Sequence, residues 1–306
     1  MTKDCKIAIG IAYHKDGEFY RKYPYIPIQV GAALSTVDLG IQRDDEGNNI
    51  SVYNPYYSEL SATYWLWKNV NADYKGLFHY RRFLTFRSNY FIKRLPTLGL
   101  YIASKIAAMF IPDSRCFFPH FSTTKLSEDL VAKYLSEFSM DLQKDIEQNN
   151  IDCYTLGSMR HSTRSVRTHI NLGIGGKHFE VLDKIIKDSY PEIYNLYVYT
   201  LKQNKIYAYN IIIAKEHYYD EYCTMLFNIL GDYRSYYING TTTVNKALLR
   251  DLGYIGEIIT NLFVHKIINE GAKHKTLNCA FVEGNVTGLS YNPDSVWKRI
   301  ITLIRQ

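Results

Sequence analysis

Few cysteines occur in this sequence, and their spacing excludes the architectures that depend on them. Five cysteines are spread over 306 residues, without a Cys-x-x-Cys pair and without histidines at the spacing of a zinc site. An odd number of dispersed cysteines also argues against a disulfide framework. We therefore expect neither structural zinc nor disulfides, and a reducing compartment fits this composition best.

Long apolar runs are missing as well. Residues 1–5 lead directly into a strand pattern, with no apolar segment that could act as a secretory signal. The most apolar stretch, residues 98–112, is interrupted by Lys105 and is shorter than the roughly 20 apolar residues that cross a bilayer. No internal repeat, low-complexity tract or linker divides the chain. These absences predict a cytoplasmic protein with a single domain over residues 1–306.

The overall composition is that of a globular protein with a positive charge. Hydrophobic residues make up 46% and charged residues 22%, which excludes a largely disordered or fibrous chain. The 28 tyrosines suit a cleft that grips sugars or bases, although an AT-rich genome explains such enrichment equally well. A net charge of +6 favours anionic partners such as a nucleotide diphosphate, a lipid phosphate or a membrane surface.

Two short apolar segments predict the centre of an α/β fold. Residues 6–12 and 74–78 have the pattern of buried strands in a parallel sheet. The first strand is followed by His14 and Lys15, and the second by the run His-Tyr-Arg-Arg at residues 79–82. Ligands of open α/β sheets bind at the carboxyl ends of the strands. We therefore expect a mainly parallel sheet flanked by helices, with both polar runs at its binding edge.

The remaining pattern divides the chain into three parts. Residues 1–86 form the predicted nucleotide-binding half, and residues 121–306 a largely helical acceptor-side half. Asn54 and Pro55 are typical of a helix start, here of a helix that reaches Lys68. Further helices are predicted in 125–150, 177–190, 191–205, 218–230 and 254–269, and strands at 151–156, 207–214 and 276–282.

Residues 87–120 form a predicted amphipathic insertion. Within it, Leu98, Ile102, Ile106 and Phe110 follow one another at i, i+4 spacing, and basic residues flank them. Two interpretations remain open. The segment lies on the inner face of the cytoplasmic membrane, which suits a lipid-linked acceptor, or it is an ordinary half-buried helix.

The strongest local signal is the cationic run at residues 79–82. Arg81 and Arg82 supply guanidinium groups that suit phosphate oxygens, and His79 adds an imidazole. Each charge-assisted hydrogen bond contributes roughly 1.5–3 kcal/mol, so two or three could hold a diphosphate without a metal. Alternatively, both arginines pair with nearby acids in a structural network.

Two longer motifs resemble a known family. The runs NPYYSELSATYWLWKN at 54–69 and DYKGLFHYRRF at 73–83 are similar to the signature of the DUF4422 family. Three weaker blocks also resemble the family and stand in the same order as in its members. GNNIS at 47–51 precedes the two motifs, and YNIIIAK at 209–215 and GYIGE at 253–257 follow them. The likeness covers nearly the whole chain. It departs from the family at Ile258, where an arginine is usual, and in the length of 87–120.

The resemblance implies a GT-A-like glycosyltransferase of capsule or O-antigen synthesis. Family members include galactofuranosyltransferases, so a UDP-sugar donor and a glycan or lipid-linked oligosaccharide acceptor are implied. GT-A enzymes commonly hold a divalent cation with an Asp-x-Asp pair, whereas residues 79–82 occupy the comparable place here. We therefore expect His14, Lys15, His79, Arg81 and Arg82 to bind the diphosphate without a metal cofactor. Asp44 and Asp45 are the rival metal pair, but adjacent loop carboxylates are usually solvated.

An inverting transfer requires a base that deprotonates the acceptor hydroxyl. Glu257 is the first candidate, although a carboxylate near a helix N-terminus also serves as a dipole partner. Glu59 and His169 are the alternatives. Asn210, polar in an apolar stretch, and Tyr80 are candidates for contact with the sugar or the acceptor.

Two other classes of function compete with this one. The positive charge, the tyrosines and the basic run 160–167 would suit a single-stranded nucleic-acid-binding protein. The basic residues are scattered, however, and no nucleic-acid-binding motif is present, so we expect no nucleic-acid partner. A polysaccharide-assembly protein that keeps the fold without a working base is the third hypothesis.

Overall fold

The structure is a computed structural model of the chain. It describes residues 5–87, 98–99, 102–103, 106, 117–119, 123–126, 128–161, 165–168, 176–238 and 251–282.

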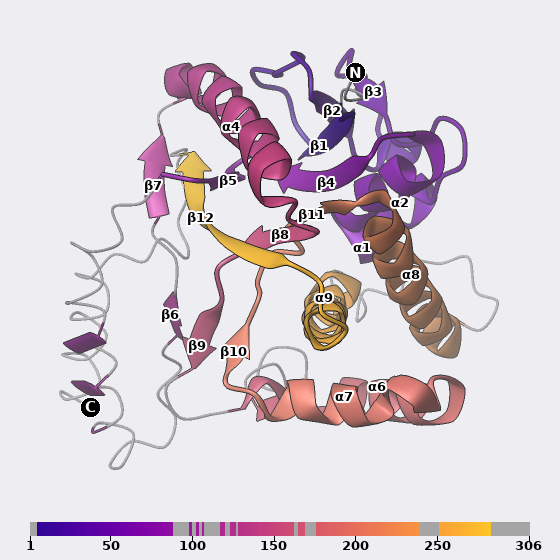
Figure 1. Cartoon of the computed structure of the whole chain (residues 1–306). Helices are drawn as coiled ribbons and strands as arrows, with labels where there is room; N and C mark the ends of the chain where they lie inside the picture. Colours follow the sequence, from indigo (N-terminus) through magenta and orange to yellow (C-terminus); the bar gives the residue numbers. More distant parts are fainter. Residues whose placement is uncertain are drawn as a thin grey trace, which may run out of the picture.

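A large sheet forms the centre of the molecule, and its first strands are parallel (Figure 1). Strand β1 (Ile7–Tyr13) is buried along its whole length and pairs with β2 (Tyr25–Gln29) and β4 (Tyr74–His79). The short strand β3 (Gln42–Arg43) extends this group beyond β2. Ala12 lies opposite Ile28 on one side and His79 on the other. The carboxyl ends of β1, β2 and β4 therefore meet at one edge, as the strand patterns predict.

Beyond β4 the sheet is mixed. Strand β4 pairs in antiparallel fashion with β5 (Arg82–Thr85) and β11 (Ile212–Lys215). The long strand β12 (His274–Val282) is antiparallel to β5 but parallel to β8 (Cys153–Leu156) and β7 (Thr123–Leu126). The α/β class is thus confirmed, while parallel pairing is confined to part of the sheet. The reversal arises because β4 and β5 form a hairpin, which strand composition alone does not reveal.

A second, three-stranded sheet lies apart from the first. It contains β6 (Phe117–Pro119), β9 (Met159–His161) and β10 (Lys205–Ile206), all in antiparallel pairing. Strand β9 includes the beginning of the basic run 160–167.

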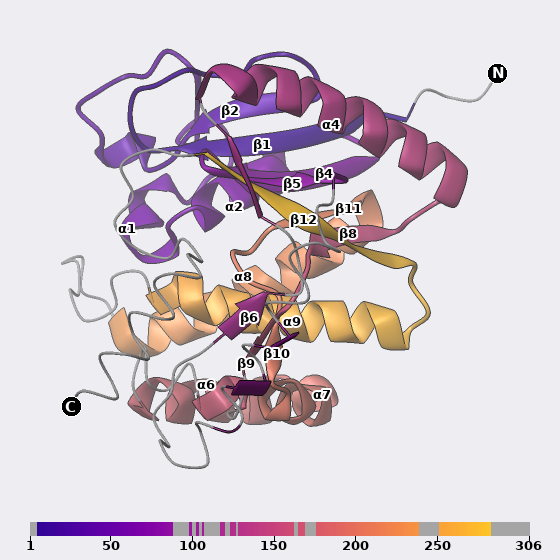
Figure 2. The same ribbon diagram turned by 90° about the vertical axis from the view of Figure 1, so that its left-hand side faces the viewer.

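Helices cover both faces of the large sheet (Figure 2). Helix α4 (Glu128–Asn149) packs its apolar side on the face formed by β1 and β4. The opposite face carries α2 (Leu60–Asn69), which comes so close that a Cβ atom at Gly10 would lie 2.5 Å from Leu66 Cδ1. Helices α8 (Glu216–Ile238) and α9 (Asp251–Asn269) lie on that side too, followed by α6 (Gly176–Ser189) and α7 (Pro191–Lys202).

The helix predicted from Asn54 to Lys68 is interrupted in the structure. Two short 3-10 helices (Ala32–Leu34 and Ser51–Tyr53) and helix α1 (Asn54–Tyr57) precede α2. The break falls at Ser58, whose φ of 52° and ψ of −129° are incompatible with a helix. Apolar residues keep their helical spacing on both sides of Ser58, so the sequence periodicity predicted one continuous helix.

The membrane-facing hypothesis for 87–120 falls largely outside the described residues, and Phe110 is among those not described. Leu98, Ile102 and Ile106 are described, and each side chain is about half exposed. No helix within the described ranges combines the length and the apolar character that crossing a bilayer requires.

Candidate functional site

Four side chains from the ends of β1 and β4 meet around the aromatic ring of Tyr80. The centroid of the Tyr80 ring lies 5.0 Å from that of His14 and 4.4 Å from that of His79. Lys15 Nζ and Arg81 Cζ lie 5.6 Å and 4.9 Å from the same centroid. We call His14, Lys15, His79 and Arg81, together with Tyr80, the cationic cluster. The structure thus brings together residues that the sequence placed at two separate strand ends.

Lys15 and Arg81, the lysine and the arginine of the cluster, are not neutralised by carboxylates in the described part of the chain. Neither Lys15 nor Arg81 forms an ion pair there, and the same holds for Arg82. The alternative in which both arginines belong to a structural acid–base network therefore finds no support among these residues. Lys15 and Arg81, which form no ion pair among the described residues, suit an anionic ligand at the carboxyl edge of the sheet.

Arg82 connects the cluster to a second group of residues. It begins β5, and its Cζ atom lies 4.2 Å from the centroid of the Tyr209 ring. Its Nε atom is buried and has no hydrogen-bond partner among the residues described. Its positive charge also lowers the pKa of Glu257. The charge of Arg82 therefore acts on Glu257, although the two side chains form no salt bridge.

Glu257 lies in the second turn of α9, and its environment makes it an unusually strong base for a carboxylate. Burial raises its pKa to about 7, and repulsion by Glu59 adds to the rise. A hydrogen bond from the backbone N–H of Tyr209 and the charge of Arg82 act in the opposite direction. A carboxylate with a pKa near the working pH is suited to general base catalysis.

Asn210 lies beside Glu59, and its side chain is occupied by internal partners. Its Nδ2 atom donates to Glu59 Oε1 at 3.2 Å and to the carbonyl oxygen of Gly253 at 3.1 Å. Its Oδ1 atom accepts a hydrogen bond from Thr260 Oγ1 at 3.2 Å. Asn210 is 3% exposed. These contacts use both amide hydrogens, and contact of Asn210 with a sugar or an acceptor stays a prediction.

The predicted strand over 207–214 also needs correction. Strand β11 covers Ile212–Lys215, and Asn210 belongs to the turn that precedes it. Tyr209 and Asn210 have φ values of 70° and 52°, which place both in the left-handed region. The run of isoleucines after Asn210 suggested an earlier start of the strand, but this turn prevents it.

Backbone strain is concentrated near the two carboxylates. Among described residues other than glycine, positive φ occurs at Ser58, Tyr209, Asn210 and Asn150. Ser58 directly precedes Glu59 and lies 4.0 Å from the position of a Cβ atom built on Gly253. Such conformations persist where the surroundings over-determine them, and they are concentrated at functional sites.

The remaining candidates have different outcomes. His169 lies outside the described residues. Asp44 is fully buried, which corrects the expectation of a solvated loop. Its carboxylate accepts hydrogen bonds from the N–H groups of Gly31 and Ala32 and from the hydroxyls of Ser51 and Ser61. Asp45 pairs with Arg43 at 2.7 Å.

Metal-ligating side chains do not gather in the described part of the chain. No group of three or more His, Cys, Asp or Glu residues there is arranged to hold a metal ion. The Asp44 carboxylate accepts hydrogen bonds from backbone N–H groups and hydroxyls, so Asp44 has a structural role in the first part of the fold.

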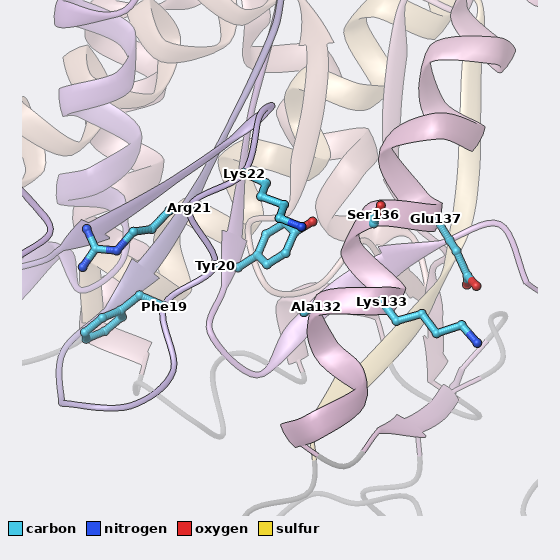
Figure 3. A pocket seen from close by; sticks show the side chains of 8 residues that line it. All are labelled: Phe19, Tyr20, Arg21, Lys22, Ala132, Lys133, Ser136 and Glu137. Atoms are coloured by element: carbon cyan, nitrogen blue, oxygen red, sulfur yellow. The ribbon is translucent and has the colours of Figure 1, made fainter.

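An open groove lies elsewhere on the surface (Figure 3). It occupies about 570 Å³ between the segment after β1 and the first half of α4. Its lining includes Tyr20, Lys22, Lys133 and Glu137 but none of the candidate site residues.

Three residues of the site escaped the sequence argument. Tyr209 donates its N–H to Glu257, and Gly256 leaves room for Asn210, whose Oδ1 lies 3.3 Å from the position of a Cβ atom there. Tyr254 is 52% exposed and lies one turn before Glu257. The signal available beforehand was the pair of glycines in GYIGE, because glycines at this spacing on a helix indicate close approach of another segment.

Comparisons with known proteins agree with this architecture. The chain matches a solved structure described as a WbbM bifunctional glycosyltransferase in its apo form, with a TM-score of 0.72 and 23% identity. The match covers 94% of this chain and 47% of that one, so the chain spans about half the length of its structural relative. At this identity the likeness shows a common fold.

Comparison with protein families identifies the family of the chain. No curated protein matches the sequence. The family model described as a domain of unknown function, DUF4422, matches residues 8–270. This match includes the cationic cluster and both carboxylates. The chain therefore belongs to the DUF4422 family.

Proposed function

We propose that this protein is a glycosyltransferase that moves a sugar from a UDP-sugar to a glycan or a lipid-linked oligosaccharide. One observation carries the proposal: Arg82 follows Arg81, which like Lys15 forms no ion pair among the described residues, and its charge acts on Glu257, a carboxylate whose pKa is raised to about 7. Glycosyl transfer from a nucleotide sugar needs both elements, a stabilised diphosphate leaving group and a base for the acceptor. The fold shared with a solved glycosyltransferase supports the same function.

The cationic cluster is the proposed diphosphate site. Lys15 and Arg81 flank Tyr80, and they would neutralise the negative charge that develops on the β-phosphate oxygen as the glycosidic bond breaks. Arg82, on the other side of the turn, would face the phosphate nearest to the sugar. These side chains would do the work that a divalent cation does in other glycosyltransferases, so we propose a metal-independent reaction.

Glu257 is the proposed general base of an inverting transfer. The acceptor hydroxyl oxygen attacks the anomeric carbon, and its proton passes to the Glu257 carboxylate. The bond between the anomeric carbon and the diphosphate oxygen breaks, and its electron pair leaves with UDP. Attack and departure take place on opposite faces, which produces inversion.

The acceptor would approach over the exposed end of α9. Tyr254 offers an aromatic face beside Glu257, on which the ring of an acceptor sugar could pack. Family resemblance makes UDP-galactofuranose the first donor to test and a capsule or O-antigen precursor the first acceptor. If the acceptor is lipid-linked, the exposed Leu98, Ile102 and Ile106 belong to the segment that would contact the inner face of the membrane.

Calorimetric titration with UDP tests the central claim directly. We expect UDP to bind equally well in EDTA and in manganese, and the Arg81→Ala variant to lose about tenfold or more in affinity. Unchanged affinity in that variant would show that the cluster is not the nucleotide site. Release of UDP from a UDP-sugar that depends on acceptor then tests transfer. A Glu257→Gln variant with normal UDP binding and normal transfer would eliminate the assigned base.

The competing hypotheses have outcomes of their own in the same experiment. Binding of a single-stranded oligonucleotide with steep salt dependence, together with no affinity for UDP, would favour a nucleic-acid-binding protein. Tight UDP binding without turnover of any UDP-sugar would favour an assembly protein that retains the fold.

A further inference from the structure

The turn before β11 touches both carboxylates of the site. The backbone N–H of Tyr209 donates to the Glu257 carboxylate. The side chain of the next residue, Asn210, donates to Glu59 Oε1 at 3.2 Å. Two adjacent residues thus hold one carboxylate each. We call Tyr209 and Asn210 the clamp turn.

The clamp turn is fixed in place by α9. Asn210 Nδ2 also donates to the carbonyl oxygen of Gly253, and Thr260 donates to Asn210 Oδ1. Gly256 lies between these two positions on the helix, and any larger side chain there would press on the Asn210 amide, whose Oδ1 lies 3.3 Å from a Cβ position. The carboxamide therefore has one orientation in which all of its hydrogen bonds are made.

Holding two carboxylates together requires such a device. Like charges at short distance repel, and Glu59 raises the pKa of Glu257 for this reason. Left-handed backbone is unfavourable for Tyr209, whereas an asparagine such as Asn210 tolerates it. The fold thus maintains strained backbone and charge repulsion at the same place, which indicates that the arrangement serves the site.

We propose that Asn210 is a positioning residue: it holds Glu59 beside Glu257, so that the charge of Glu59 acts on the Glu257 carboxylate together with burial. This inference rests on the proposed function, in which Glu257 takes the proton of the acceptor. Without Asn210, the Glu59 side chain would turn toward solvent and Glu257 would become a weaker base. Asn210 itself need not touch substrate.

The protonation of Glu257 can be measured without knowing the substrate. Protein labelled with 13C at the glutamate carboxyl carbon is titrated by NMR, and the Glu257 signal is assigned by its loss in the Glu257→Gln variant. We expect a midpoint near pH 7 in the unmodified chain. Both Asn210→Ala and Glu59→Gln lower this midpoint by roughly one pH unit.

A double-variant cycle separates positioning from general disruption. If Asn210 acts through Glu59, then Asn210→Ala produces no further shift in a chain that already carries Glu59→Gln. Asn261 supplies the matched control, because this buried amide bonds to both backbone groups of Tyr207 and to the Glu257 carbonyl oxygen but to neither carboxylate. Asn261→Ala should leave the midpoint in place.

The outcomes test the positioning role of Asn210 separately from the glycosyltransferase function. An unchanged midpoint in folded Asn210→Ala protein, or equal shifts from Asn210→Ala and Asn261→Ala, overturns the positioning role. If Asn210→Ala does not fold, Thr260→Val weakens the same amide more gently and must lower the midpoint as well. Shifts as expected in a protein that fails to bind UDP would leave the clamp turn standing and refute the glycosyltransferase function.

Discussion

The guanidinium carbon of Arg82 lies 4.2 Å from the centroid of the Tyr209 ring. This contact joins the hairpin after β4 to the clamp turn before β11, and so joins the proposed diphosphate site to the proposed base. Several measurable consequences depend on it.

Replacement of Arg82 by alanine should weaken UDP binding. One charge-assisted hydrogen bond contributes about 1.5–3 kcal/mol, so we expect an affinity loss of about 10- to 100-fold by calorimetry. Arg82→Lys should recover only part of this loss, since lysine keeps the charge but lacks the planar fork that stacks on Tyr209. Arg234 stacks on Tyr53 at 3.9 Å and offers a matched arginine–tyrosine pair outside the cluster. Arg234→Ala should bind UDP normally, and an equal loss there would contradict the assignment.

The rate of transfer should depend on pH through Glu257. A base must be deprotonated to act, and the pKa of Glu257 is raised to about 7. We therefore expect kcat/KM to fall about tenfold for each pH unit below 7 and to level off above it. Profiles of kcat/KM from pH 5 to pH 9 provide the test. A midpoint near pH 4.5 would mean that Glu257 is solvated or uninvolved.

Glu257 should also reduce the stability of the protein above neutral pH. Its pKa is higher in the folded chain than the ordinary 4.5, so the folded state binds more protons between these values and stability falls as pH rises through this window. Glu257→Gln should therefore unfold at higher urea concentration at pH 8, with a gain of up to about 3 kcal/mol. The two proteins should converge toward pH 4.5. A destabilised variant at pH 8 would argue against a strained, functional carboxylate.

Asp44 should matter for folding rather than for binding. Its buried carboxylate accepts hydrogen bonds from two backbone N–H groups and two hydroxyls. In Asp44→Asn, an amide NH2 group would replace one carboxylate oxygen and would point at groups that can only donate or must reorient. We expect a loss of about 3 kcal/mol in urea unfolding. Asp45→Asn breaks only a partly exposed pair with Arg43 and should lose less than about 1 kcal/mol. Similar losses from both variants would show that Asp44 is not the anchor of this segment.

Tyr254 should affect the acceptor alone. Tyr254→Ala removes an aromatic face worth about 0.5–1.5 kcal/mol, so we expect the acceptor KM to rise about 2- to 10-fold while UDP affinity is unchanged. Tyr254→Phe should restore the lower value. Tyr199, which is 51% exposed on α7, provides a tyrosine of matched exposure. A rise in KM of the same size in Tyr199→Ala would point to a non-specific effect.

Local sequence patterns were sufficient to predict that the residues of the cationic cluster lie close together. Residues 6–12 and 74–78 are continuous apolar runs, so they predicted buried strands, and parallel strands bring their carboxyl ends to one edge. His14, Lys15, His79 and Arg81 follow those runs directly and meet around Tyr80 as that rule requires. The α/β class and most helix positions were predictable for the same reason, because apolar periodicity is a property of neighbouring residues.

Only the tertiary structure showed that Glu59 and Glu257 lie in one site. Glu59 and Asn210 are 151 positions apart, and their contact depends on how α9 packs against the break at Ser58. The mixed order of the sheet, the burial of Asp44 and the left-handed clamp turn likewise arise from contacts between distant segments. Burial and a second carboxylate raise the pKa of Glu257, and neither is encoded in the residues beside it. The sequence alone thus determined which basic residues gather at the edge of the sheet, and packing determined which carboxylate has a raised pKa.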